Sequence, residues 1–135
     1  MIVGTEWLIE ADECDPEKLR DEDKLRGIFA HIIQDLDLKV VNEIWHTFSG
    51  EAGVTGLALL TESHLACHTY PENRVATFNL YCCRTRPEWS WESNLKEMIG
   101  AQSVHVIKIE RGDRRPETPR SDMGDPRFRV VGGEQ

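Results

Sequence analysis

The sequence lacks any long apolar run. No segment of its 135 residues approaches the roughly 20 consecutive apolar residues that a membrane-spanning helix needs. The opening stretch, MIVGTEWLIEADECD, is too acidic for a secretory signal peptide. With 39% hydrophobic and 30% charged residues, the composition is typical of a soluble globular protein. We therefore expect one cytoplasmic domain with no membrane partner.

Positive charge is also scarce. Sixteen lysines and arginines stand against twenty-four aspartates and glutamates, which gives a net charge of -8. Because nucleic-acid backbones are bound by clustered cations, this balance predicts no nucleic-acid partner. A cationic small molecule is compatible with it.

Cysteines are few, and none has the spacing of a paired ligand. The sequence contains Cys14, Cys67, Cys82 and Cys83, with no CxxC motif. A bridge between the adjacent Cys82 and Cys83 would form a strained ring. Although His64, Cys67 and His68 lie close together, structural zinc sites usually have paired ligand spacings. We expect free thiols and no metal.

Two helices are predicted. Asp15 followed by Pro16 is a favourable helix start. Apolar residues then recur at the spacing of one helical face: Leu25, Ile28, Phe29, Ile32, Ile33 and Leu36. A second helix is expected to begin at Ser90 and to end at Gly100 as its C-cap.

The remaining elements are predicted to be strands, at residues 5–11, 40–48, 57–62, 64–70, 75–83 and 103–109. Alternation in the fifth of these puts Cys82 on the apolar face and Cys83 on the other. Strands joined by short turns, with only two helices, indicate an α+β two-layer sandwich: an antiparallel sheet with both helices packed on one face. Its other face needs water, a ligand or a second subunit. Residues 1–112 form this domain, and residues 113–135, which mix charge with proline, are predicted to be a flexible tail.

Residues 61–70 are the densest polar segment. If the segment is extended, His64, His68 and Tyr70 share one face and Cys67 points to the other. These residues alone leave two interpretations open. Ser63 and the histidines are turn and surface groups, or Ser63 or a cysteine is a nucleophile with His68 as its base. No GxSxG motif supports the second.

Four short motifs add a third interpretation. They are Gly53-Val54-Thr55-Gly56, Glu62-Ser63-His64, His68-Thr69-Tyr70-Pro71-Glu72 and Tyr81-Cys82-Cys83. At this spacing the sequence resembles the short prokaryotic S-adenosylmethionine decarboxylase proenzyme family, whose members depend on a pyruvoyl group. The resemblance covers residues 4 to 110.

The resemblance implies that the chain cuts itself between Glu62 and Ser63. The Ser63 hydroxyl attacks the preceding carbonyl to give an ester, and β-elimination followed by hydrolysis converts Ser63 into the covalent pyruvoyl cofactor. The products are residues 1–62 and a second chain headed by the pyruvoyl group. His68 and Thr55 match positions that assist this processing, although the family usually has serine where Thr55 stands.

The resemblance also implies the reaction. A Schiff base forms between the Ser63-derived pyruvoyl group and S-adenosylmethionine, CO2 leaves, and Cys83 returns a proton. Phe48 matches an aromatic residue that stacks on adenine, and Tyr70 and Glu10 are further substrate-binding candidates. The product is decarboxylated S-adenosylmethionine, the aminopropyl donor of spermidine and polyamine synthesis. The expected assembly is a homodimer of processed units with sites near the subunit interface.

Three positions around the expected pocket depart from the family. Tyr70 stands where tryptophan is usual, Cys82-Cys83-Arg84 replaces Thr-Cys-Gly, and the loop from Ser49 to Ala52 differs from the usual proline-containing one. Two alternatives therefore stay open. One is a pyruvoyl-dependent decarboxylase of the same fold that acts on arginine or ornithine. The other is an unprocessed, non-catalytic homologue that binds an adenosyl ligand or regulates a partner.

Overall fold

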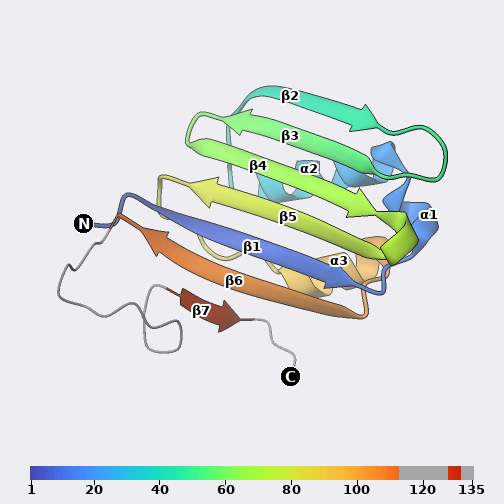
Figure 1. Cartoon of the computed structure of the whole chain (residues 1–135). Helices are drawn as coiled ribbons and strands as arrows, with labels where there is room; N and C mark the ends of the chain where they lie inside the picture. Colours follow the sequence, from blue (N-terminus) through green and yellow to red (C-terminus); the bar gives the residue numbers. More distant parts are fainter. Residues whose placement is uncertain (113–127, 132–135) are drawn as a thin grey trace.

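A single antiparallel sheet organises the molecule (Figure 1). The computed structural model describes residues 1–112 and 128–131. The strands are β1 (Gly4–Asp12), β2 (Val40–Thr47), β3 (Val54–Leu60), β4 (Ser63–Tyr70), β5 (Val75–Cys82), β6 (Ser103–Arg111) and β7 (Phe128–Val131). Their order across the sheet is β2-β3-β4-β5-β1-β6-β7, and every neighbouring pair is antiparallel.

Helices cover one face of this sheet only (Figure 1). They are α1 (Pro16–Leu19), α2 (Glu22–Asp35) and α3 (Trp91–Ile99), and a short 3-10 turn spans Pro71–Asn73. The core between the layers is apolar and includes Trp7, Phe29, Leu65, Leu80, Trp91 and Leu95, each at most 2% exposed. The predicted α+β two-layer sandwich is confirmed. Within the described residues, no helix is long and apolar enough to cross a membrane.

The first predicted helix is divided in two. Asp21 interrupts it with extended backbone, and the Asp21 carboxylate accepts the Lys24 backbone N–H at 3.3 Å as the N-cap of α2. The Asp15 carboxylate caps α1 in the same way, through Glu17 N–H. The first backbone N–H groups of a helix have no partner within the helix, and the Asp21 carboxylate accepts one of them. A second helix can therefore begin at Asp21, which explains the break. The second predicted helix is confirmed, with Gly100 in the left-handed conformation at φ 71°.

The predicted strands match the observed ones to within two residues at either end, except for one strand, and the structure adds a further strand in the tail. The strand expected at 57–62 runs from Val54 to Leu60, so Thr61 and Glu62 form a two-residue turn into β4. Most of the tail predicted at 113–135 lies outside the described residues. Within it, however, Phe128–Val131 pairs with β6 as β7, where no strand was predicted. Its aromatic and β-branched residues suit a strand, and the edge of β6 supplies free backbone groups.

The motif around Thr55 is shaped by packing. A Cβ atom on Gly56 would lie 2.4 Å from the Trp45 ring, and one on Gly53 would lie 2.1 Å from the backbone oxygen of Thr69. The buried Thr69 hydroxyl accepts the Val54 N–H at 2.8 Å and donates to the Leu19 carbonyl at 2.7 Å. These contacts fix β3 against β4 at the point where Thr55 projects.

The other face of the sheet is open and partly apolar. Five large apolar side chains on it are 37% to 63% exposed: Leu8, Ile44, Leu57, Leu59 and Ile107. They lie on four strands, β1, β2, β3 and β6, so exposed apolar side chains occur on both halves of the sheet. Ile44 pairs with Leu57, and Leu8 pairs with Ile107, so these side chains form exposed apolar patches, which often mark interaction sites.

Candidate active site

The Glu62–Ser63 peptide bond lies at a strained hairpin turn. Leu60 pairs with Ser63 across the turn, and Thr61 and Glu62 connect them. Ser63 has φ 128°, a conformation that favours glycine. A non-glycine residue there costs about 1–3 kcal/mol, and such strain tends to occur at functional sites.

Three reactive groups meet at this turn. The Ser63 hydroxyl lies 3.0 Å from the Cys83 thiol. The backbone N–H of Cys83 donates to the carbonyl oxygen of Glu62 at 2.9 Å. A donor in this position polarises a carbonyl and stabilises negative charge on its oxygen, as in an oxyanion hole. The turn therefore combines an activated carbonyl with a neighbouring hydroxyl and a thiol.

The side chain of Glu62 is buried and paired. Its carboxylate is 3% exposed and receives two bonds from the Arg86 guanidinium, one of them from Nε to Oε1 at 3.0 Å. The pair raises the pKa of Arg86 above its ordinary value through this hydrogen bond. Sequence reasoning missed Arg86 because nothing in the sequence distinguishes it from the neighbouring Arg84.

The adjacent cysteines have opposite environments. Cys82 is fully buried, whereas Cys83 is exposed, as the alternation predicted. Burial raises the pKa of Cys82 to about 12, and the negative charge of Glu62 adds to this shift. Cys14 and Cys67 are likewise buried, so Cys83 is the one accessible thiol of the four.

A second cluster lies at the other end of β4. Thr55 on β3 pairs with His68 on β4, and the Thr55 hydroxyl is 3.2 Å from Nδ1 of His68. Five residues of strand separate His68 from Ser63, which corresponds to about 16 Å. The structure therefore does not bring His68 and Thr55 to Ser63 within one chain.

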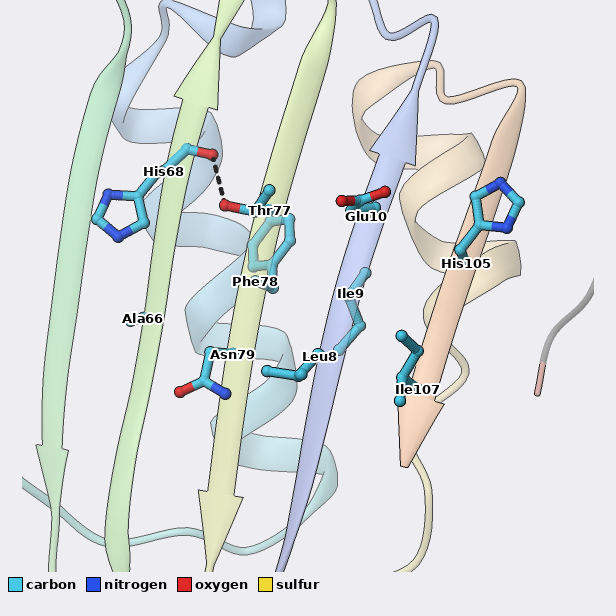
Figure 2. A pocket seen from close by; sticks show the side chains of 10 residues that line it. All are labelled: Leu8, Ile9, Glu10, Ala66, His68, Thr77, Phe78, Asn79, His105 and Ile107. Carbon is cyan, nitrogen blue, oxygen red and sulfur yellow. Dashed lines mark hydrogen bonds between the residues drawn. The ribbon is translucent and has the colours of Figure 1, made fainter. Parts of the chain in front are cut away.

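A hollow of about 450 Å³ opens beside His68 on the uncovered face (Figure 2). Its walls are two rows of side chains that cross four strands: His68, Thr77, Glu10 and His105 in one row, and Ala66, Asn79, Leu8 and Ile107 in the other. Within this hollow, the Thr77 hydroxyl donates to the His68 carbonyl at 3.5 Å (Figure 2). Glu10 places a carboxylate there, where it can meet a cationic ligand.

The two remaining candidates flank this end of the sheet. Phe48 follows β2 and is 47% exposed, with its ring 4.4 Å from that of His46 in an edge-to-face contact. Tyr70 ends β4 and is 40% exposed. Neither side chain lines the hollow, and both are free to contact a ligand or another subunit. The predicted binding residues thus gather at the His68 end, and the predicted reacting residues at the Ser63 end.

The three residues weighed as zinc ligands do not converge. His64 and His68 point to the open face, whereas Cys67 is fully buried under the sheet. His64 is held by Asn79, with Nε2 donating to Oδ1 at 2.8 Å, and Asn79 donates in turn to Glu6 at 2.7 Å. Alternate faces of one strand cannot ligate a common ion.

The family is decided by a match over most of the chain. Residues 5–112 match the family described as S-adenosylmethionine decarboxylase. The chain belongs to this family. The resemblance noted in the sequence is thereby confirmed.

Relatives and a solved structure agree with S-adenosylmethionine decarboxylase family membership. A protein of Pyrococcus abyssi is 35% identical over 112 residues, covering 82% of this chain and 79% of the relative. One of Prochlorococcus marinus is 39% identical over 109 residues, covering 79% and 85%. Both are named S-adenosylmethionine decarboxylase proenzyme. The crystal structure of the adenosylmethionine decarboxylase from Aquifex aeolicus VF5 has the same fold, with a TM-score of 0.72 at 22% identity over 88% of this chain and 98% of that one.

Proposed function

We propose that this chain is a self-cleaving, pyruvoyl-dependent decarboxylase that acts on S-adenosylmethionine. The observation that carries the proposal is the Glu62–Ser63 turn, where the carbonyl accepts the Cys83 N–H and the Ser63 hydroxyl meets the Cys83 thiol. Family membership supplies the substrate class, since the relatives are named for it.

Self-cleavage uses groups already present at the turn. Ser63 Oγ loses its proton and attacks the Glu62 carbonyl carbon, the C–N bond breaks, and an ester forms while the nitrogen becomes an amine. The Cys83 N–H stabilises the oxygen charge that develops. Elimination then breaks the Cβ–Oγ bond and releases the Glu62 carboxylate. Water replaces the nitrogen of residue 63, which leaves as ammonia, and a pyruvoyl group heads the second chain.

The residues around Ser63 fit this group. They provide an exposed thiol 3.0 Å from Ser63 Oγ, and Ser63 itself is only partly buried, so a substrate amine can approach it. The pyruvoyl group supplies a carbonyl that accepts the electron pair left when CO2 departs. Cys83 holds the proton that returns to the substrate Cα, and the buried Cys82 packs the core.

We further propose that the active form is a homodimer joined through the open faces. The 16 Å that separates His68 from Ser63 is too long for assistance within one chain. In this dimer the open faces of the two sheets pack against each other, and the two-fold axis lies between them, perpendicular to the strands. The strands of the two subunits then run in opposite directions. The Ser63 end of β4 in one subunit therefore lies over the His68 end of β4 in its partner. The exposed apolar side chains of this face are then covered, and Thr55, Phe48, Tyr70 and Glu10 approach Ser63 from the partner subunit.

Co-expression tests this arrangement. His68→Ala alone is expected to cleave slowly, because the processing histidine is missing from both sites of the dimer. Together with a tagged Ser63→Ala chain, the His68→Ala chain regains a partner subunit that carries His68, so its cleavage should recover. Intact mass measured over time follows the two chains separately. If cleavage of the His68→Ala chain does not recover, His68 does not act across the interface.

The substrate is tested by release of CO2. Purified wild-type protein is incubated with carboxyl-labelled S-adenosylmethionine, arginine and ornithine, and labelled CO2 is counted. We expect release from S-adenosylmethionine alone, because the exposed ring of Phe48 at the His68 end of the sheet suits stacking on an adenine. Release from arginine or ornithine alone would contradict the substrate, and no release from any would contradict the catalytic role.

The same proposal indicates the pathway and the cellular compartment in which the enzyme works. The product is the aminopropyl donor of spermidine synthesis. A working thiol at Cys83 and three further free cysteines suit a reducing compartment, the cytoplasm. The catalytic domain comprises residues 1–112. The net charge of -8 of the whole 135-residue chain argues against a nucleic-acid partner.

A further inference from the structure

We propose that Arg86 is a positioning residue for self-cleavage, which it promotes by anchoring the buried side chain of Glu62. This inference rests on the proposed function and adds a residue to its first step. Arg86 lies on the connection between β5 and α3, outside every motif that suggested the chemistry. It touches Glu62 and not the reacting atoms.

The contact is strong enough to hold the turn. The planar guanidinium meets both carboxylate oxygens of Glu62, so the pair fixes orientation as well as distance. The side chains of Glu62 and Arg86 are only 3% and 17% exposed, and the attraction is therefore weakly screened by water. An exposed surface pair would exert little control of this kind.

The residue that Arg86 anchors forms one side of the bond to be broken. Glu62 supplies the carbonyl that Ser63 attacks, and this carbonyl is also held by the Cys83 N–H at 2.9 Å. Two residues of the connection between β5 and α3 therefore hold Glu62: Cys83 binds its carbonyl, and Arg86 binds its side chain. With both in place, the carbonyl carbon stays within reach of Ser63 Oγ in the strained conformation at φ 128°.

Loss of Arg86 would release this constraint. A buried carboxylate without a partner is unfavourable, so Glu62 would turn toward solvent or take up a proton. Either change displaces the carbonyl from the Cys83 N–H. Since a displacement of about 1 Å can cost two orders of magnitude in rate, the acyl shift should slow at least about tenfold.

The experiment compares Arg86→Gln with Arg84→Gln, a matched loss of one positive charge from an exposed arginine two residues away. Each chain is made in a cell-free system, and the uncleaved fraction is followed by intact mass. We expect cleavage at least about tenfold slower in Arg86→Gln and within twofold of wild type in Arg84→Gln. Cleaved Arg86→Gln, counted per pyruvoyl group, should decarboxylate within twofold of wild type.

Two further measurements separate positioning from stability. Hydroxylamine cuts esters but not peptide bonds, so it should not restore chain cleavage in Arg86→Gln if the acyl shift itself is slow. Arg86→Lys keeps the charge but loses the two-point contact, and should cleave at an intermediate rate even if Arg86→Gln fails to fold. Cleavage of Arg86→Lys or Arg86→Gln at the wild-type rate, equal slowing in Arg84→Gln, or full rescue by hydroxylamine would overturn the inference. A wild-type chain that stays uncleaved would overturn the proposed function as well, which distinguishes the two failures.

Discussion

Replacing Ser63 with alanine is expected to leave one intact chain of 15.5 kDa, where wild type yields residues 1–62 and 63–135. Alanine has neither a hydroxyl to attack the Glu62 carbonyl nor a leaving group on Cβ, so both the acyl shift and the elimination are blocked. No pyruvoyl group forms, and decarboxylation should fall to background. Intact mass and CO2 release measure the two losses independently.

The same turn supplies the control for this experiment. Thr61→Ala also removes a hydroxyl from the connection between β3 and β4, but from an exposed residue that does not adjoin the cleaved bond. It should cleave and decarboxylate like wild type. Cleavage of the Ser63→Ala chain at the same position would show that a contaminating protease, rather than Ser63, cuts the protein.

The second large effect is expected for Cys83→Ala. Its backbone N–H still bonds to the Glu62 carbonyl, so self-cleavage should continue. The proton donor 3.0 Å from Ser63 Oγ is lost, and general acid catalysis is typically worth about 10²–10⁴-fold, so turnover per pyruvoyl group should drop by that order. Steady-state CO2 release, normalised to the cleaved fraction, gives the ratio.

Cys82→Ala is the matched control for this variant. Cys82 is buried on the core side of the sheet, whereas Cys83 is exposed, so the Cys82 thiol cannot reach a substrate in place of Cys83. We expect lower stability in Cys82→Ala, because a buried side chain shrinks, with turnover close to wild type. Equal turnover losses in Cys82→Ala and Cys83→Ala would contradict the assignment of the proton donor to Cys83.

Much of the fold could be predicted because local patterns and tertiary packing agree. Alternation along β5 separated Cys82 from Cys83, and helical periodicity from Leu25 to Leu36 identified the face of α2 that packs on the sheet. The break at Asp21 was missed because an aspartate in a polar stretch acts as a helix N-cap only if its backbone is non-helical, and the sequence does not show this. The strand β7 was missed because it has only four residues and follows a segment that mixes charge with proline, so no alternation marks it.

Candidate residues for the site could be named from the sequence, but the distances between them could not. Motif spacing brought Ser63, His68 and Thr55 into one hypothesis, yet a strand of five residues carries His68 away from Ser63. The spacing of motifs in a sequence does not reveal whether their residues come together within one subunit or across two subunits. Glu62 lies on the turn between β3 and β4, and Arg86 follows β5, 24 positions later in the sequence. No local sequence pattern predicts a contact between residues so far apart.

The order of strands has a consequence for the lifetime of the enzyme. Residues 1–62 contribute β1, β2 and β3, and residues 63–135 contribute the others, with β1 inserted between β5 and β6. A cut at the turn therefore divides a sheet whose two parts interleave. The uncut chain can unfold and refold by itself, whereas the cut form must find its other half, at a rate that depends on concentration. If the chain cuts itself as proposed, maturation makes unfolding effectively one-way in dilute solution, and the rate of unfolding then sets how long a cut molecule works.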